Sequence, residues 1–321
     1  MKSKYIYDFE KPLNEIQMKI DELEVASHKT GVDVTLKLND LKKELNDKSI
    51  EIYSNLTRWE KVQLARHPNR PHSIDYINKI TNYWFELHGD RAFSDDVSIL
   101  AGIARIDALK VVIIGQEKGR NTKEKMYRNF GMPQPEGYRK ALRVMKLAEK
   151  YNLPIITLID TPGAYPGIGA EERGQAEAIA RNLFEMSRLK VPVISIVIGE
   201  GASGGALALG LADRILCMEN TWYSVISPEG CASILYRDAS MSKEAADSMK
   251  VTSIDLHEMG IADEIIKEPL GGAHRDYNTS AENVKNSIIA NINKLSEYPI
   301  STLIEQRKFK YDKIGSWTKD E

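Results

Sequence analysis

The sequence predicts an α/β fold in which parallel strands are covered by helices, preceded by a helical hairpin. Two observations lead to this prediction. From about residue 81 onward, short apolar runs alternate with amphipathic helical patterns, and repeated strand–helix–strand units are typical of parallel sheets. Before residue 57, apolar residues instead recur at the three- and four-residue spacing of helices.

The N-terminal part carries two helical stripes, separated by the segment 28–31. The first stripe consists of Leu13, Ile16, Ile20 and Leu23, and the second of Val34, Leu38, Leu41 and Leu45. Each stripe places its apolar residues on one helix face. We therefore expect a helical hairpin over residues 1–56. It carries no recognisable chemistry, so we expect a role in assembly or packing.

The main domain is expected over residues 57–299. Strands are predicted over 97–106 and 110–115, joined by a tight turn, and over 154–159, 191–198, 214–218 and 222–226. Helices are predicted over 137–151, 170–189, 203–212 and 242–250. The last residues, 300–321, are polar with scattered aromatic side chains, and we expect a loosely held tail there.

The composition argues against several function classes. The net charge is −2, so no overall field attracts nucleic acid or an anionic membrane. Cys217 and Cys231 are the only cysteines and do not match a zinc-ligand spacing, so we expect no metal in this chain. The N-terminus lacks the apolar segment of a signal peptide, and the tract 191–198 is too short to cross a bilayer. We expect a cytoplasmic protein.

The most informative segment is the glycine-rich stretch 199–210, which directly follows the apolar run 191–198. Glycine allows conformations and close approaches that a side chain would prevent. The first N–H groups of a helix have no partner within it and carry partial positive charge. Gly204 and Gly205 are therefore candidates to present backbone N–H groups to an oxygen that becomes negative during a reaction.

The same stretch matches two unrelated motifs. Gly199, Gly201 and Gly204 have the spacing of a dinucleotide-binding loop, although the helix predicted after them is short. Gly201, Ser203 and Gly205 have the spacing of a nucleophile elbow, and both aspartate and histidine follow later in the chain. A serine hydrolase that uses Ser203 therefore stays open as an alternative. The sequence has no GxxxxGK[ST] loop and so no obvious ATP site.

Two further loops precede helices at places where ligands commonly bind. The loop 160–167 contains two Pro-Gly pairs and follows a predicted strand, and open α/β sheets bind ligands beyond the carboxyl ends of their strands. The loop 128–140 is also rich in glycine and proline, and basic residues such as Lys118 and Arg120 precede it. Such a basic loop could hold phosphate groups, while a solvated loop explains each single lysine equally well.

Several motifs appear in one order along the chain. They occupy residues 128–141, 160–167, 170–175, 199–205, 223–230 and 269–276. Together they resemble the family of bacterial acetyl-coenzyme A carboxylase carboxyltransferase alpha subunits, and the resemblance extends over nearly the whole chain. One departure is Ala202, where many relatives are expected to have glycine.

The resemblance implies a crotonase-like (ClpP/crotonase) fold, a spiral of ββα units with helices outside. It implies a carboxyltransferase beta subunit as partner, with zinc in that subunit, in an α2β2 heterotetramer. Carboxyl groups would pass from carboxybiotin, held on the biotin carboxyl carrier protein, to acetyl-CoA, forming malonyl-CoA in the first committed step of fatty acid biosynthesis. ATP would be used by the separate biotin carboxylase component.

The resemblance also implies a site. Gly204 and Gly205 would donate backbone N–H groups to the oxyanion of biotin, which can itself take the substrate's proton, so that no protein base is required. The pocket would be shaped by Arg128, Phe130, Gly131, Met132, Gly163, Ala164, Tyr165, Gly167, Gly201 and Ser203. Two alternatives stay open beside the hydrolase: a crotonase-fold acyl-CoA enzyme that works without biotin, and a scaffold without catalytic activity.

Overall fold

The computed structural model describes residues 6–315, and the chain divides into two compact units with their boundary between Glu60 and Lys61. In the first unit, helices α1 (Lys11–Thr30) and α2 (Thr35–Ser54) follow the short helix η1 (Asp8–Glu10). Gly31 ends α1 with a φ of 69°, a left-handed conformation that suits glycine. Lys42 of α2 pairs with Glu24 of α1 at 3.1 Å. Leu13, Ile16 and Ile20 are buried, as their helical spacing predicts.

The second unit is built on one sheet. Its strands are β1 (Tyr83–Glu86), β2 (Ile99–Ile106), β3 (Leu109–Gln116), β4 (Ile155–Thr161), β5 (Val193–Ala202), β6 (Arg214–Met218), β7 (Trp222–Ser224) and β8 (Glu264–Ile266). They are ordered β1-β2-β3-β4-β5-β6-β8, and β7 pairs with the end of β5. The pairs β1–β2 and β2–β3 are antiparallel, and the pairs from β3 to β8 are parallel.

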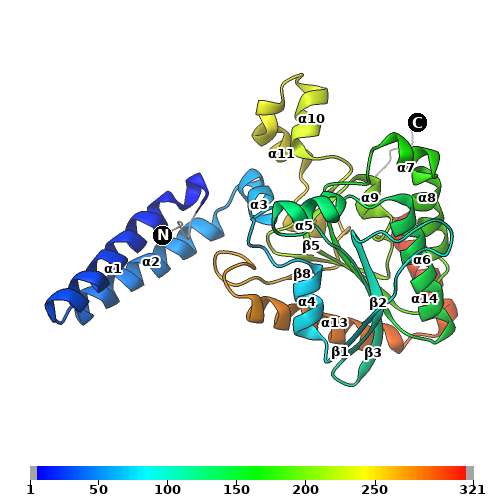
Figure 1. The fold of residues 1–321 in the computed structure, drawn as a ribbon, viewed down its shortest axis with the longest axis horizontal. Helices are drawn as coiled ribbons and strands as arrows, with labels where there is room; N and C mark the ends of the chain where they lie inside the picture. The colour runs from blue at the N-terminus through cyan, green and yellow to red at the C-terminus, as the bar shows by residue number, and fades with distance from the viewer. Residues whose placement is uncertain (1–5, 316–321) are drawn as a thin grey trace, which may run out of the picture. The chain divides into compact units, whose positions relative to one another are not determined.

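Helices cover both faces of this sheet (Figure 1). Helices α4 (Ser73–Ile80) and α13 (Tyr277–Ser296) pack on one face, and α6 (Pro135–Lys150), α8 (Gln175–Met186) and α9 (Ser203–Leu207) pack on the other. In β4, Ile156 and Leu158 join the first core and Ile155 and Ile159 the second. The strand therefore contributes apolar side chains to both cores, as expected for a parallel strand buried on both faces.

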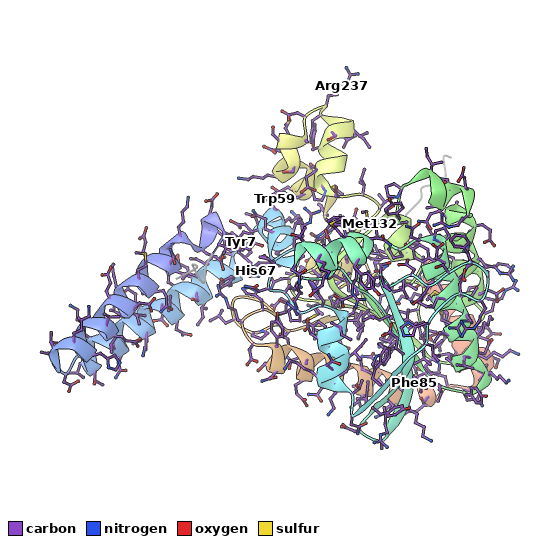
Figure 2. All side chains as sticks on the ribbon, viewed as in Figure 1. Tyr7, Trp59, His67, Phe85, Met132 and Arg237 are labelled. Carbon is purple, nitrogen blue, oxygen red and sulfur yellow. The ribbon has the colours of Figure 1, made fainter. Side chains whose placement is uncertain are left out.

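The remaining helices lie around this framework. They are α3 (Arg58–Ala65), α5 (Thr122–Tyr127), η2 (Asn129–Gly131), α7 (Ile168–Glu172), α10 (Pro228–Leu235), η3 (Ala239–Met241), α11 (Ser242–Met249), α12 (Ser253–Glu258) and α14 (Ile300–Asp312). Figure 1 shows α10 and α11 projecting from this unit as a small lobe, and Arg237 marks its tip in Figure 2. No helix within residues 6–315 is long and apolar enough to cross a membrane.

Several predicted elements differ in extent from the structure. The helix expected over 203–212 is α9, which ends at Leu207, and the strand expected over 222–226 is β7, which ends at Ser224. The helix expected over 170–189 is divided into α7 and α8, because Gly174 adopts a φ of 82° and interrupts it. Strand β5 continues through the first glycines to Ala202, where Gly201 pairs with Thr161 on one side and Tyr223 on the other. Glycine allows this close approach, since a Cβ on Gly201 would lie 2.7 Å from the Tyr223 ring.

The expectation of a loosely held tail is wrong for residues 300–312, which form helix α14. Its anchor is Arg307, a side chain without exposure to solvent. The guanidinium pairs with Asp213 at 2.7 Å and donates to the main-chain oxygens of Met186, Leu189 and Val191. Nothing in the sequence indicates this anchor, because an arginine is usually exposed and Arg307 is buried. Residues 316–321 lie outside the described part of the chain.

Candidate active site

The turn between β5 and α9 presents two glycine amides at a helix start. Ser203, the first residue of α9, has a φ of 63°, which L-residues rarely adopt and which often marks a functional site. Gly204 and Gly205 follow as the second and third helical residues, and N–H groups at these positions lie outside the helical hydrogen-bond ladder. The structure therefore provides two amides that can donate to another group.

Gly205 is packed directly against the main chain of the loop after β4. A Cβ added at Gly205 would lie 2.5 Å from the carbonyl carbon of Gly163 and closer still to the amide nitrogen of Ala164. A Cβ at Gly204 would instead meet the Ile179 side chain at 3.4 Å, an ordinary contact. The two positions thus differ. Only at position 205 does the close approach of two main chains require glycine.

Gly204 borders an apolar cavity of about 270 Å³, which we call the Gly204 cavity. The other residues that line it are Ser203, Leu207, Tyr223, Ser224, Val225, Leu256 and Ile261. Three of these side chains carry a hydroxyl and none is charged, and most of the lining surface is apolar. A backbone N–H in such surroundings interacts with negative charge more strongly than it would in water.

Hydrogen bonds hold the two predicted pocket loops together. Thr161 Oγ1 donates to Gly131 O at 2.6 Å and accepts from Gly163 N–H at 3.1 Å. The Tyr165 N–H donates to Pro133 O at 3.0 Å, which joins the loops a second time. The two loops are therefore neighbours, and the threonine at the end of β4 connects them.

The first of these loops has an unusual backbone. Asn129, Phe130 and Gly131 have consecutive positive φ values of 48°, 56° and 77°. Gly131 must be glycine here because a Cβ would lie 2.5 Å from Cγ of Lys118. The conformation leaves the Phe130 ring half-exposed at the wall of a second cavity of about 250 Å³, which we call the Lys118 cavity.

Ion pairs dominate the Lys118 cavity, at the carboxyl ends of β4 and β5. Lys118 Nζ lies 2.6 Å from Asp160 and 2.7 Å from Glu200, and Arg66 contacts Glu200 at 2.7 Å. Burial opposes the charge of Glu200, but Lys118 and Arg66 outweigh it and hold the pKa of this carboxyl below its usual value. Arg120 pairs with Asp75. These cations already have carboxylate partners, which argues against the phosphate-binding role considered for the basic loop.

The remaining predicted pocket residues line neither of the two cavities. The Arg128 guanidinium donates to Val97 O, and Gly167 precedes α7 where a Cβ would meet the Tyr165 ring. Met132 lines neither cavity, and Figure 2 shows it far from Phe85, toward the other end of this unit. The predicted residues therefore do not line one common pocket in this chain. Ser203 and Gly204 border one cavity and Phe130 the other.

The geometry does not support a dinucleotide-binding loop. Residues 199–202 belong to strand β5, so the dinucleotide pattern does not form the turn between strand and helix that such a loop needs. The turn at Ser203 has the strand-to-helix geometry of a nucleophile elbow, but the partners of a catalytic serine are missing among the described residues. Within residues 6–315, no histidine is hydrogen-bonded to Ser203. His257 Nδ1 lies 3.0 Å from Ala262 O, and the His274 ring stacks on His67. Burial and neighbouring charges lower the pKa of His274 to about 2.

Comparison with known proteins decides between the expectations. Residues 6–315 match the family described as "Acetyl co-enzyme A carboxylase carboxyltransferase-like". The acetyl-coenzyme A carboxylase carboxyl transferase subunits alpha of Coxiella burnetii and Listeria monocytogenes are both 54% identical to this chain, over 98% and 96% of its length and 98% and 97% of theirs. The chain belongs to this family. It is thus a carboxyltransferase alpha subunit of acetyl-CoA carboxylase, which confirms the expectation from the ordered motifs.

Solved structures confirm the fold. The malonate decarboxylase hetero-tetramer of a Pseudomonas, solved in complex with coenzyme A, contains a chain that matches with a TM-score of 0.59 at 15% identity, over 73% of this chain and 91% of that one. Transcarboxylase 12S matches with a TM-score of 0.54 at 21% identity, over 66% of this chain and 41% of that one. The carboxyltransferase alpha subunit therefore has the expected crotonase-like α/β fold with N-terminal helices.

Proposed function

We propose that this alpha subunit, together with a carboxyltransferase beta subunit, transfers the carboxyl group of carboxybiotin to acetyl-CoA and so forms malonyl-CoA for fatty acid biosynthesis. The start of α9 carries the proposal. There, Gly204 and Gly205 have amides outside the helical ladder, and Gly204 stands at the wall of an apolar cavity. Carboxyl transfer from biotin needs such donors, because it leaves negative charge on the ureido oxygen.

The two amides are suited to stabilise that charge. Gly205 packs tightly against the main chain of Gly163 and Ala164, so the amides are fixed before the reaction. No reorganisation is then needed when negative charge develops. The partial positive charge at a helix start adds to the effect. Loss of one donor of this kind typically costs about 3–4 kcal/mol in the transition state. Ser203 would line the pocket directly. The loops at 128–132 and 163–167 do not line the Gly204 cavity and would shape the pocket by supporting Gly205 from behind its wall.

The residues around the Gly204 cavity also suit a reaction without a protein base. Its lining contains no carboxylate, imidazole or amine among the described residues. Burial raises the pKa of Tyr223 above its usual value, so its hydroxyl stays neutral. The proton that leaves acetyl-CoA would therefore pass to the other substrate, as the family resemblance implies, while this chain supplies donors and positions the reactants.

The remaining parts of the reaction would lie on other chains. We propose an α2β2 heterotetramer in which the beta subunit supplies a zinc ribbon and most contacts to coenzyme A. The biotin carboxyl carrier protein would bring carboxybiotin, and biotin carboxylase would consume ATP to load it. Assembly in the cytoplasm would follow from the location of these partners.

Co-expression with the beta subunit tests this proposal. We expect the two chains to co-purify and to form malonyl-CoA from acetyl-CoA and carboxybiotin, and we expect each chain alone to be inactive. The matched control omits biotin. An alpha subunit that turns over acyl-CoA alone and without biotin would contradict the proposal and would favour the biotin-independent crotonase-fold enzyme.

A further inference from the structure

Gln116 connects the end of β3 to the turn that carries Gly204 and Gly205. Its side chain has no exposure to solvent. The Nε2 group donates to Gly205 O at 2.8 Å, and Oε1 accepts from the Asp160 N–H at 3.1 Å. The carbonyl can only accept and the N–H can only donate, so these partners allow one orientation of the side-chain amide. One buried amide thus connects the ends of β3 and β4 to the first turn of α9.

The bond to Gly205 replaces a missing helical bond. In a continuing α-helix, the N–H of Leu209 would donate to Gly205 O, but it donates to Ala206 O at 3.2 Å instead. The carbonyl of Gly205 is therefore held by Gln116 and not by the helix. Two consecutive glycines have more conformational freedom than any other pair, so such a restraint matters more here than elsewhere.

The second bond relates this turn to the loop after β4. Asp160, whose N–H is bound by Gln116, directly precedes Thr161, the residue that joins Gly131 to Gly163. Gly163 in turn packs against Cα of Gly205. Gly205 is thus fixed by main-chain packing at its Cα and by the Gln116 amide at its carbonyl oxygen.

We propose that Gln116 is a positioning residue for the oxyanion site at Gly204 and Gly205. The inference rests on the proposed function and goes beyond it, because Gln116 touches no substrate and acts only through the backbone. Donors at an oxyanion site work only when they point at the oxygen, and a displacement of about 1 Å can reduce a rate by about 100-fold. Loss of the Gln116 amide should therefore reduce turnover more than it reduces substrate binding.

The test uses the reconstituted complex of alpha and beta subunits. Gln116→Met keeps the length of the side chain and removes both hydrogen bonds. We expect kcat to fall by about 10- to 100-fold, with the KM for acetyl-CoA changed by no more than about two-fold. The matched control is Thr157→Val. Thr157 is equally buried, and its hydroxyl lies within hydrogen-bond distance of Ser195 Oγ and of Leu209 O, which follows α9, and not of Gly205.

The outcomes separate the two proposals. An inactive wild-type complex would contradict the proposed function. An active wild type, with Gln116→Met within about two-fold of Thr157→Val in kcat, would overturn only the role of Gln116. Gln116→Glu is a second variant that tests the same role if the Gln116→Met complex does not assemble. A carboxyl group donates to Gly205 O only when it is protonated. The kcat of the Gln116→Glu complex, relative to wild type, should therefore fall as pH rises. A ratio independent of pH would contradict the inference.

Discussion

A carboxyltransferase complex with Gly205→Ala should assemble but lose about 100-fold or more of its kcat. The single added methyl group would lie 2.5 Å from the carbonyl carbon of Gly163, in a contact between two main chains that neither can relieve by a rotamer change. The turn must shift to make room, and its amides then no longer point at the oxyanion. Removal of one such donor reduces kcat by about 100- to 1,000-fold in comparable sites.

Two comparisons make this prediction specific. Gly169→Ala is the matched control, because Gly169 lies in helix α7 and a Cβ there would meet a side chain, the guanidinium of Arg173 at 3.1 Å, and no main chain. Its kcat should stay close to wild type. Gly204→Ala keeps its N–H and would contact Ile179 at 3.4 Å, so it should lose less activity than Gly205→Ala. Wild-type turnover by an assembled Gly205→Ala complex would contradict the account of this site.

The largest effect on stability is expected from Arg307→Ala. This change would remove a guanidinium that pairs with Asp213 and donates to three main-chain oxygens, all in the interior. It would leave the Asp213 carboxylate buried without its partner. Breaking a buried pair in this way typically costs about 3–5 kcal/mol, a large part of the stability of an ordinary domain. Urea unfolding followed by circular dichroism measures this loss.

Lys308→Ala is the control for Arg307→Ala. Lys308 is the next residue of α14 and is exposed, so its replacement should change the free energy of unfolding by less than about 0.5 kcal/mol. Equal unfolding midpoints for the two variants would show that α14 is not anchored through Arg307.

The sequence was informative where the signal is local. The spacing of Leu13, Ile16 and Ile20 predicts α1, because one helix face is defined within a few turns. The glycines at 204 and 205 indicate an unusual backbone, because glycine disfavours a helix and is used where the main chain needs a special conformation or a close approach. The spacing of Val284, Ile288 and Ile292 in α13 is equally regular, and this helix could have been predicted in the same way.

The supporting contacts could not be predicted, because they join residues far apart in the chain. Gln116 and Gly205 are 89 positions apart, and Arg307 and Asp213 are 94 apart. No local pattern indicates that a glutamine at a strand end will bind a particular carbonyl, or that an arginine in a polar helix will be buried. Likewise, Lys118 resembled a free cation in sequence, and only the fold brings Asp160 and Glu200 to it.

A structure of the alpha–beta complex with the biotinylated carrier protein bound tests the central claim most directly. The account predicts that the ureido oxygen of biotin lies about 2.7–3.1 Å from the amide nitrogen of Gly204, Gly205 or both, beside the Gly204 cavity. A biotin ring that receives its hydrogen bonds from side chains instead, with both glycine amides turned away from it, would contradict the account.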